Sequence, residues 1–219
     1  MQRVLEPEVM DSWEEAVEYD AMDFTDVNTA FAERAIALKP PLTAKVLDAG
    51  TGTARIPVLL CLKYPHWQVF GIDLAQNMLQ IGVKHVEHAG LQNQIVLELV
   101  DAKQLTYKDG DFDLVLSNSL VHHLPDPLLF FRELKRVLKP NGAILIRDLI
   151  RPSDEETMNN LVESIGTEYD THQKQLFRDS LHAALTLDEV NQLLSQAHLP
   201  GVVVYQSSDR HWTAERAWG

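Results

Sequence analysis

The stretch of sequence that decides the fold runs Val46-Leu47-Asp48-Ala49-Gly50-Thr51-Gly52-Thr53-Ala54-Arg55. An apolar segment of strand character leads into an acidic residue and two alternating glycines, and a helical segment begins at about residue 54. Glycines at such a bend allow a tight backbone turn and the close approach of a ligand. The N-terminus of the following helix offers free N–H groups to a negative group. The stretch therefore predicts a strand–turn–helix unit with a ligand-binding loop.

The spacing of the two glycines narrows the class of ligand. A dinucleotide-binding loop of the pattern G-x-G-x-x-G would have its third glycine at position 55, which here is Arg55. Asp48 favours the positive ammonium of a ligand and disfavours a pyrophosphate. We therefore expect a nucleoside cofactor with an amino-acid tail, and an NAD-dependent reductase is disfavoured.

Composition and charge exclude several function classes. The length of 219 residues predicts one domain or a domain with small additions. A net charge of −13 opposes binding to nucleic acid and to anionic membranes. The single cysteine, Cys61, excludes a disulfide framework within the chain and fits a reducing compartment. With no membrane-length apolar run and no targeting pattern, we expect a cytoplasmic protein without nucleic-acid or membrane partners, its oligomeric state left open.

Strands and helices alternate after Pro40-Pro41, which predicts a parallel sheet with helices on both faces. Strands are predicted at 44–49, 68–73, 95–100, 113–117 and 143–148, and helices near 54–64, 75–89 and 127–138. Two last strands, 202–207 and 211–217, are joined by only about three residues, and so short a link connects antiparallel strands. The sequence predicts an α/β, doubly wound sheet that ends in a reversed hairpin strand.

Turn and capping patterns set the boundaries of the remaining segments. Capping boxes are predicted at Ser12–Glu15, Ser153–Glu156 and Thr186–Glu189, a proline-started helix at Asp126-Pro127, and a tight connection at Asn141-Gly142. The second and third boxes predict helices at about 153–168 and 187–197. We therefore expect an N-terminal helical segment over residues 1–40 and one domain over 41–219, with a helical insertion at about 151–185.

Five motifs in this order resemble the class I S-adenosylmethionine-dependent methyltransferases over about residues 44–149. They are Asp48-x-Gly50-x-Gly52-x-Ala54, Phe70-Gly71-Ile72-Asp73, Val100-Asp101-Ala102, Phe112-Asp113-Leu114-Val115-Leu116-Ser117-Asn118 and Leu138-Lys139-Pro140-Asn141-Gly142. The first motif has Ala54 where the family usually has a third glycine. The resemblance implies a Rossmann-like seven-stranded mixed sheet, S-adenosyl-L-methionine as cofactor and S-adenosyl-L-homocysteine as product.

The resemblance also implies which residues hold the cofactor. They are Asp48, Ala49, Gly50, Thr51, Gly52, Asp73, Leu74, Met78, Asp101, Ala102 and Asn118. Asp73 would bind both ribose hydroxyls, Asp101 would accept a hydrogen bond from the adenine amine, and Met78 would pack on the adenine face. The alternatives are a solvated aspartate at a strand end, a surface turn and a core methionine.

Methyl transfer is an in-line displacement at a sulfonium, so the protein mainly positions and desolvates the reactants. A general base is needed only where the nucleophile loses a proton on attack. His122 and His123, on the loop after the fourth predicted strand, are candidates for substrate contact or proton removal, and Asp148 is a candidate on the acceptor side. Each of the three could instead serve packing or an ion pair. Asn118 and Asp148 offer only one carboxylate between them, so no metal is expected.

The acceptor and the N-terminal segment complete these expectations. The Asn/Asp-Pro-Pro-Tyr motif is absent after Asn118, and together with the acidic charge this favours a small organic acceptor. In the resembling fold a leading helical segment often closes over the cofactor, which makes Tyr19 and Asn28 candidates for contact with its methionine end. The alternative function is a non-catalytic protein that binds the cofactor or a partner.

Overall fold

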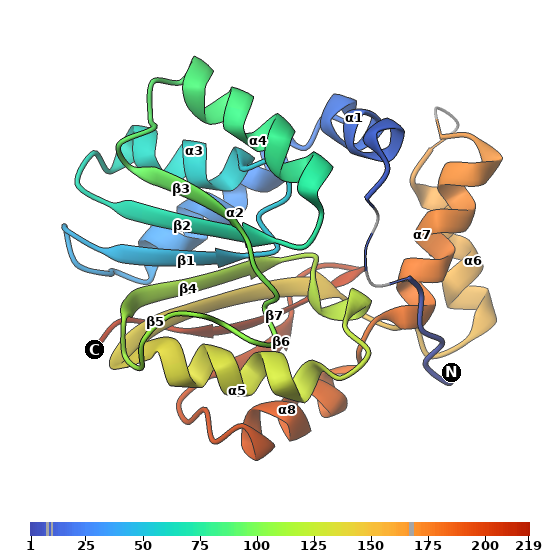
Figure 1. Cartoon of the computed structure of the whole chain (residues 1–219). Helices are drawn as coiled ribbons and strands as arrows, with labels where there is room; N and C mark the ends of the chain where they lie inside the picture. Colours follow the sequence, from blue (N-terminus) through green and yellow to red (C-terminus); the bar gives the residue numbers. More distant parts are fainter. Residues whose placement is uncertain (8, 10, 167–168) are drawn as a thin grey trace.

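The chain folds around one seven-stranded sheet with the order β3-β2-β1-β4-β5-β7-β6 (Figure 1). The computed structural model describes residues 1–7, 9, 11–166 and 169–219. The strands are β1 (Lys45–Ala49), β2 (Gln68–Asp73), β3 (Ile95–Leu99), β4 (Phe112–Asn118), β5 (Leu138–Leu149), β6 (Val203–Gln206) and β7 (His211–Arg216). β1 to β5 pair in parallel, and β7 is antiparallel to both β5 and β6. The predicted doubly wound sheet with a reversed terminal strand is confirmed.

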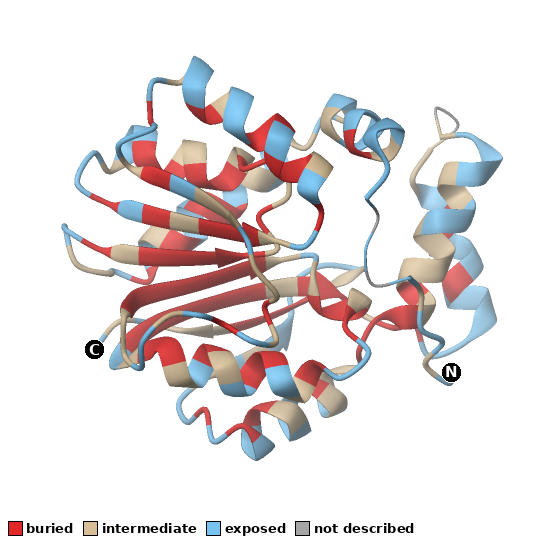
Figure 2. Ribbon diagram, viewed as in Figure 1, coloured by how far each residue is buried: buried red, intermediate tan, exposed pale blue. Residues whose placement is uncertain are grey.

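Helices cover both faces of this sheet. The helices are α1 (Trp13–Ala21), α2 (Thr25–Ala37), α3 (Arg55–Lys63), α4 (Gln76–His88), α5 (Pro127–Val137), α6 (Glu155–Ser164), α7 (Thr171–Ala183) and α8 (Leu187–Gln196), with a 3₁₀ turn, η1, at Val121–His123. One buried cluster joins α2, α3 and α4 to the sheet, and a second joins α5 and α8 to its other face. Figure 2 shows the buried residues concentrated in the strands and on the inner sides of these helices. Within the described residues, no helix combines the length and apolar character that crossing a bilayer requires.

The helical periodicity of α5 shows how sequence dictates this packing. Phe130, Phe131, Leu134 and Val137 recur at three- and four-residue spacing and are all fully buried against the sheet. The Asp126 side chain accepts a hydrogen bond from the Leu128 N–H at 3.1 Å, so the predicted cap is confirmed. The helix therefore begins where its N–H groups have a side-chain acceptor and buries one apolar stripe.

Three boundaries differ from the sequence prediction. β5 begins at Leu138 and contains Asn141-Gly142. Phe112 of β4 pairs with Leu138, and Leu114 of β4 pairs with Ala143, so β5 has extra residues between these two paired positions. The predicted tight connection at Asn141-Gly142 is therefore a register shift inside β5. The predicted capping box at Ser153 is wrong, because the Asp154 side chain accepts from the Thr157 N–H and α6 begins at Glu155. α6 ends at Ser164, and residues 167–168 of the predicted helix lie outside the described residues. The boxes at Ser12 and Thr186 are confirmed.

Residues 1–7 are not helical, in contrast to the prediction for residues 1–40. Residues 1–7, named here the N-terminal strap, run beside α6 and α7 (Figure 1). The Met1 ammonium donates to the Ser153 carbonyl at 3.1 Å, and the Val4 N–H donates to the His182 carbonyl at 3.1 Å. α1 lies on α4, where Ala16 joins a buried cluster with Met78. The N-terminal residues therefore cross the edge of the sheet at which the parallel strands end.

Candidate active site

The glycine loop between β1 and α3 has a backbone that demands glycine. Gly50 and Gly52 have φ values of 75° and 53°, a region that residues with a side chain rarely adopt. A Cβ atom on Gly50 would lie 2.9 Å from the Leu120 Cβ. Ala54 also has a positive φ, 60°, and is fully buried at the start of α3. The alanine that replaces the family's third glycine therefore occupies a conformation that a glycine would adopt without strain.

Asp73 joins this loop to the next strand and helix. Its carboxylate accepts hydrogen bonds from the Gly52 N–H at 2.8 Å and from the Ala75 N–H at 2.9 Å. Burial raises the pKa of Asp73, while these backbone N–H groups oppose the rise. One carboxylate at the carboxyl end of β2 thus fixes the position of the loop and the beginning of α4.

Asp48, at the carboxyl end of β1, is the more deeply buried carboxyl group. Its side chain is 1% exposed and accepts a hydrogen bond from the Thr51 hydroxyl at 2.7 Å. Burial raises the pKa of Asp48 to about 7, and the charge of Asp73 adds to the effect. Within the described part of the chain, no lysine, arginine or histidine pairs with either carboxylate. The loop therefore surrounds a place where a positively charged ligand group would be stabilised.

The residues predicted on the adenine side lie at the ends of β2 and β3. Leu74 is 37% exposed, whereas Ala102 is buried. The Asp101 carboxylate accepts from the Lys103 N–H at 2.8 Å and pairs with the Lys103 ammonium at 2.9 Å. Met78 is buried with Ala16 beneath α1. Met78 thus contributes to the core between α1 and α4.

His122 and Asp148 form a buried pair on the side of the sheet that faces α5. The His122 Nδ1 lies 2.5 Å from one Asp148 carboxylate oxygen, and the Val121 N–H donates to the other oxygen. The Glu6 carboxylate of the N-terminal strap lies 3.5 Å from the His122 Nε2 and 3.1 Å from the His123 Nδ1. Burial lowers the pKa of His122, but the carboxylates of Asp148 and Glu6 outweigh burial and raise it. Sequence reasoning missed Glu6, because no local pattern connects residue 6 with residue 122.

His123 and Asn118 have different surroundings from those of His122. Burial and the neighbouring His122 lower the pKa of His123 to about 4. Asn118 accepts a hydrogen bond from the Arg147 Nε at 3.0 Å, on the sheet face opposite to Asp148. Asn118 and Asp148 therefore do not converge on a common point. The atoms of Glu6, His122 and His123 that could ligate a metal lie within 4.8 Å of one another, and the contacts of the Glu6 carboxylate with both histidines account for that spacing.

α1 holds Tyr19 over the glycine loop. The Tyr19 ring lies 4.0 Å from the position of a Cβ on Gly52, and burial followed by the charge of Asp73 raises the pKa of the Tyr19 phenol. Asp20 fastens the helix by accepting from the Arg55 guanidinium at 3.0 Å and contacting the His85 Nε2 at 2.9 Å. Asn28 is half-buried in the first turn of α2, the helix that follows the one carrying Tyr19.

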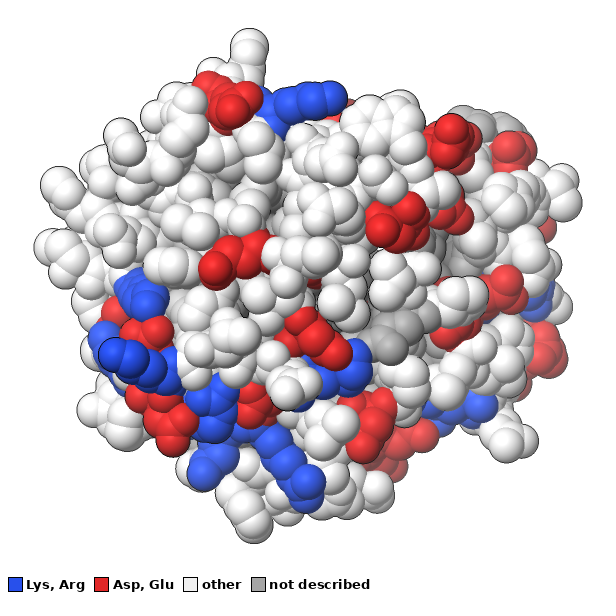
Figure 3. Space-filling model, in the orientation of Figure 1, with Lys and Arg blue, Asp and Glu red and all other residues white. Residues whose placement is uncertain are grey.

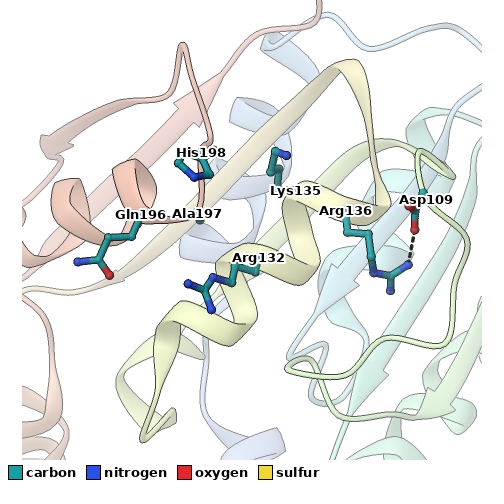
Figure 4. A pocket seen from close by; sticks show the side chains of 7 residues that line it. All are labelled: Asp109, Arg132, Lys135, Arg136, Gln196, Ala197 and His198. Atoms are coloured by element: carbon teal, nitrogen blue, oxygen red, sulfur yellow. Dashed lines mark hydrogen bonds and ion pairs between the residues drawn. The ribbon is translucent and has the colours of Figure 1, made fainter.

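A cavity of about 430 Å³ lies away from these residues (Figure 4). Its lining consists of Asp109, Arg132, Lys135, Arg136, Gln196, Ala197 and His198. These side chains come from α5, from the end of α8 and from the loop before β4, and none is a predicted site residue. Figure 3 shows lysine and arginine side chains gathered over α5 on the same face. The predicted chemistry therefore centres on the strand ends, away from this basic surface.

A family model described as a methyltransferase domain matches residues 43–214. The chain belongs to the class I S-adenosylmethionine-dependent methyltransferases. An S-adenosylmethionine-dependent methyltransferase structure from Aquifex aeolicus has a TM-score of 0.68 at 18% identity, covering 94% of this chain and 98% of that one. The YcgJ protein from Bacillus subtilis has a TM-score of 0.62 at 20% identity, covering 82% and 70%. These low identities show a common fold.

Two relatives in sequence are more similar over a shorter region. Methyltransferase GfsG from Streptomyces halstedii is 31% identical over 124 residues, which are 56% of this chain and 44% of that protein. Demethylmenaquinone methyltransferase from Staphylococcus haemolyticus is 34% identical over 111 residues, which are 50% and 45% of the two chains. The matched regions thus span less than half the length of either relative.

The methyltransferase site residues fit S-adenosylmethionine, the cofactor of this family. The positive-φ glycines leave the loop without side chains where a nucleoside would approach. The buried Asp48 and the half-buried Asp73 supply carboxyl groups without a cationic partner among the described residues, which suits a cofactor that carries a sulfonium and an ammonium. Arg55, at the position where a dinucleotide-binding loop would have its third glycine, forms an ion pair with Asp20 and so holds α1 in place.

Replacing Asp48 by asparagine is expected to stabilise the cofactor-free methyltransferase above pH 7. The pKa of Asp48 rises from 3.8 to about 7 on folding, so the wild type loses stability as the pH rises between these values. Asparagine does not ionise and can still accept from Thr51. At about 1.4 kcal/mol per pKa unit, the gain at pH 8 is about 4 kcal/mol at most. Urea unfolding of wild type and Asp48→Asn at pH 8 and pH 4.5 measures this difference in the free energy of unfolding. An equal gain at the two pH values would contradict the raised pKa of Asp48.

Proposed function

We propose that this methyltransferase transfers a methyl group from S-adenosylmethionine to a small-molecule acceptor. The observation that carries the proposal is the Asp73 carboxylate, which holds the glycine loop at the carboxyl edge of a doubly wound sheet. Ligands of such sheets bind at this edge, where the strand order reverses. Here the reversal lies between β1 and β4, beside Asp48 and Asn118. The cofactor supplies an activated methyl group with a neutral thioether as its leaving group.

The residues of the chain would bind and orient the cofactor. We assign Asp73 to the ribose hydroxyls, Asp48 with Ala49 and Thr51 to the methionine end, and Asp101 with Ala102 to the adenine. An aspartate carboxylate can accept from two hydroxyls at once. Leu74 and Met78, which flank the start of α4, would border the nucleoside. These assignments are supported by the position of each residue at the strand ends.

His122 would remove a proton from acceptors that must lose one. Asp148 accepts from its Nδ1 and thereby directs the Nε2 away from β5. In the described conformation, Glu6 lies against that Nε2 and favours the charged imidazolium. Because an imidazolium cannot accept a proton, the base becomes competent when the N-terminal strap withdraws and His122 is neutral. His123, whose pKa is lowered, would line the same side of the site.

α1 would form a lid over the bound cofactor. It covers the glycine loop through Tyr19 and is held by the contacts of Asp20 with Arg55 and His85, whereas the strap, which would withdraw from His122, is not part of this lid. Such a lid excludes water and completes the site on closure. α2 packs in the sheet core through Phe31, so the moving part would end before α2 and leave Asn28 near the hinge.

Small-molecule acceptors are favoured over nucleic acids by the net charge of −13. The demethylmenaquinone and phosphoethanolamine methyltransferases among the relatives carry names of small acceptors. A cytoplasmic location is supported by the single, buried cysteine, Cys61. The alternative is a non-catalytic binder of S-adenosylmethionine, which would use the same loop without turnover.

The proposed function predicts both cofactor affinity and turnover. Asp73→Ala should weaken binding of S-adenosylhomocysteine by about 1–3 kcal/mol, because two hydroxyls lose a charged acceptor. Calorimetry measures this change, and Asp188→Ala on the exposed face of α8 is the matched control. Wild type should also transfer labelled methyl to a member of a panel of phenols, amines and carboxylic acids. Tight binding without transfer to any of them would favour the non-catalytic alternative.

The electrostatic role of Glu6 predicts a shift in the titration of His122. Asp148, Glu6 and Arg3 are the charged groups that act on this ring. Glu6→Gln removes a negative charge that stabilises the imidazolium, so His122 should lose its proton at a lower pH. NMR titration of the ring Cε1–H measures the midpoint, with Glu14→Gln on the exposed side of α1 as control. An unchanged midpoint in Glu6→Gln would place the carboxylate away from His122 in solution.

The lid proposal predicts ligand-dependent protection of the N-terminal residues. S-adenosylhomocysteine should slow proteolytic cleavage before residue 23. Asp20→Asn loses a charged contact with Arg55 and His85, so the free protein should be cut about tenfold faster, corresponding to roughly 1.4 kcal/mol of easier opening. Glu18→Gln on the same helix is the control. Equal cleavage with and without ligand would mean that these residues only pack against the domain.

A further inference from the structure

Arg147 is a cation near the proposed methyl-transfer point that lacks an anionic partner. Its guanidinium Nε donates to the Asn118 side chain at 3.0 Å, and another nitrogen donates to the Val27 carbonyl at 3.4 Å. A guanidinium carries five N–H donors. Among the described residues, no carboxylate lies within ion-pair distance of Arg147, although most other arginines in this acidic chain have such a partner. The remaining donors are therefore available to a ligand.

The surroundings of Arg147 form a small cavity of about 170 Å³ between α2 and the β5–β7 part of the sheet. The lining combines cationic, hydroxyl and apolar side chains: Ala30, Phe31, Arg34, Leu145, Arg147, Tyr205, Ser207, Ser208, His211 and Thr213. The Phe31 ring centre lies 5.1 Å from the Arg147 guanidinium carbon and holds one side of the group. The cavity thus has the Arg147 guanidinium, which contacts Asn118, at one part of its lining and hydroxyl groups of the β6–β7 hairpin at another.

The charges around the cavity do not balance. Arg34 is neutralised by Glu215, with which it forms two hydrogen bonds. Burial and the positive charge of Arg147 lower the pKa of His211 to about 4, so His211 is neutral at pH 7. Burial lowers the pKa of Arg147, and the negative charge of Asp148 opposes that lowering. Asp148 is paired with His122 and does not line the cavity, and no carboxylate is among the described lining residues, so a single negative charge on a ligand would balance Arg147 there.

We propose that this cavity binds a carboxylate group of the methyl acceptor through Arg147. The planar guanidinium matches a carboxylate in two parallel hydrogen bonds, and a monoanion balances the one free charge. β5 explains the arrangement, because neighbouring residues of a strand face opposite sides of the sheet. Arg147 faces the α2 side and would hold the acceptor, whereas Asp148 faces the α5 side and orients His122. This inference rests on the proposed function and specifies the acceptor class of the same site.

The test compares aromatic carboxylic acids with their neutral amides. The probes are benzoate, salicylate and 3-hydroxybenzoate, each paired with its amide and titrated into protein saturated with S-adenosylhomocysteine. We expect at least one acid to bind about tenfold or more tightly than its amide. Arg147→Gln should abolish this preference, whereas Arg132→Gln on the exposed side of α5 should leave it intact. Circular dichroism checks the fold of each variant.

Arg147→Lys keeps the charge without the planar fork and serves where the glutamine variant does not fold. It should retain part of the preference and weaken acid binding several-fold. The inference is overturned if no acid binds better than its amide, or if the preference survives in Arg147→Gln or is unchanged in Arg147→Lys. Binding of S-adenosylhomocysteine is measured in the same samples. If the acids show no Arg147-dependent preference while cofactor binding still depends on Asp73, the carboxylate inference fails and the proposed methyl-transfer function is unaffected.

Discussion

Two carboxyl groups without a cationic partner among the described residues are the constraint on which the site depends. Asp48, which is buried, and Asp73, which is half-buried, lie at the ends of adjacent strands and accept hydrogen bonds from a hydroxyl and from backbone N–H groups. Burying carboxylates in this way costs stability, which the raised pKa of Asp48 expresses directly. A cofactor that brings positive charge removes this cost, so ligand binding and folding stability are linked at the glycine loop.

An excess of positive charge lies on the other side of the point where the strand order reverses, at the end of β5. Arg147 brings positive charge to a small cavity whose described lining residues include no carboxylate, while Asp148, its neighbour in β5, is paired with His122. The end of β5 therefore presents two chemically different sides, which we propose serve acceptor binding on one side and proton transfer on the other. An acceptor with a carboxylate would meet the first, and its nucleophile would approach the second only after Glu6 has moved from His122.

The sequence specified the sheet and the cofactor loop because both depend on local patterns. Alternating apolar segments and the short link before β7 predicted the topology, the glycine spacing predicted the loop after Asp48, and the motif that ends in Asp73 implied the ribose-binding residue. Pairings between distant residues carried no such pattern. The contact of Glu6 with His122 joins residues far apart in the chain, and Asn118 meets Arg147 through strand pairing. The shift inside β5 at Asn141-Gly142 also escaped prediction, since these residues are typical of a turn.

Proton release on cofactor binding tests the central electrostatic account most directly. Calorimetry at pH 7 in buffers of different ionisation enthalpy counts the protons exchanged when S-adenosylmethionine binds. Because the pKa of Asp48 is about 7 in the free protein, about half of these groups are protonated there and would ionise beside the cationic cofactor. The wild type should therefore release about half a proton more than Asp48→Asn. Equal proton counts for the two proteins would contradict the account.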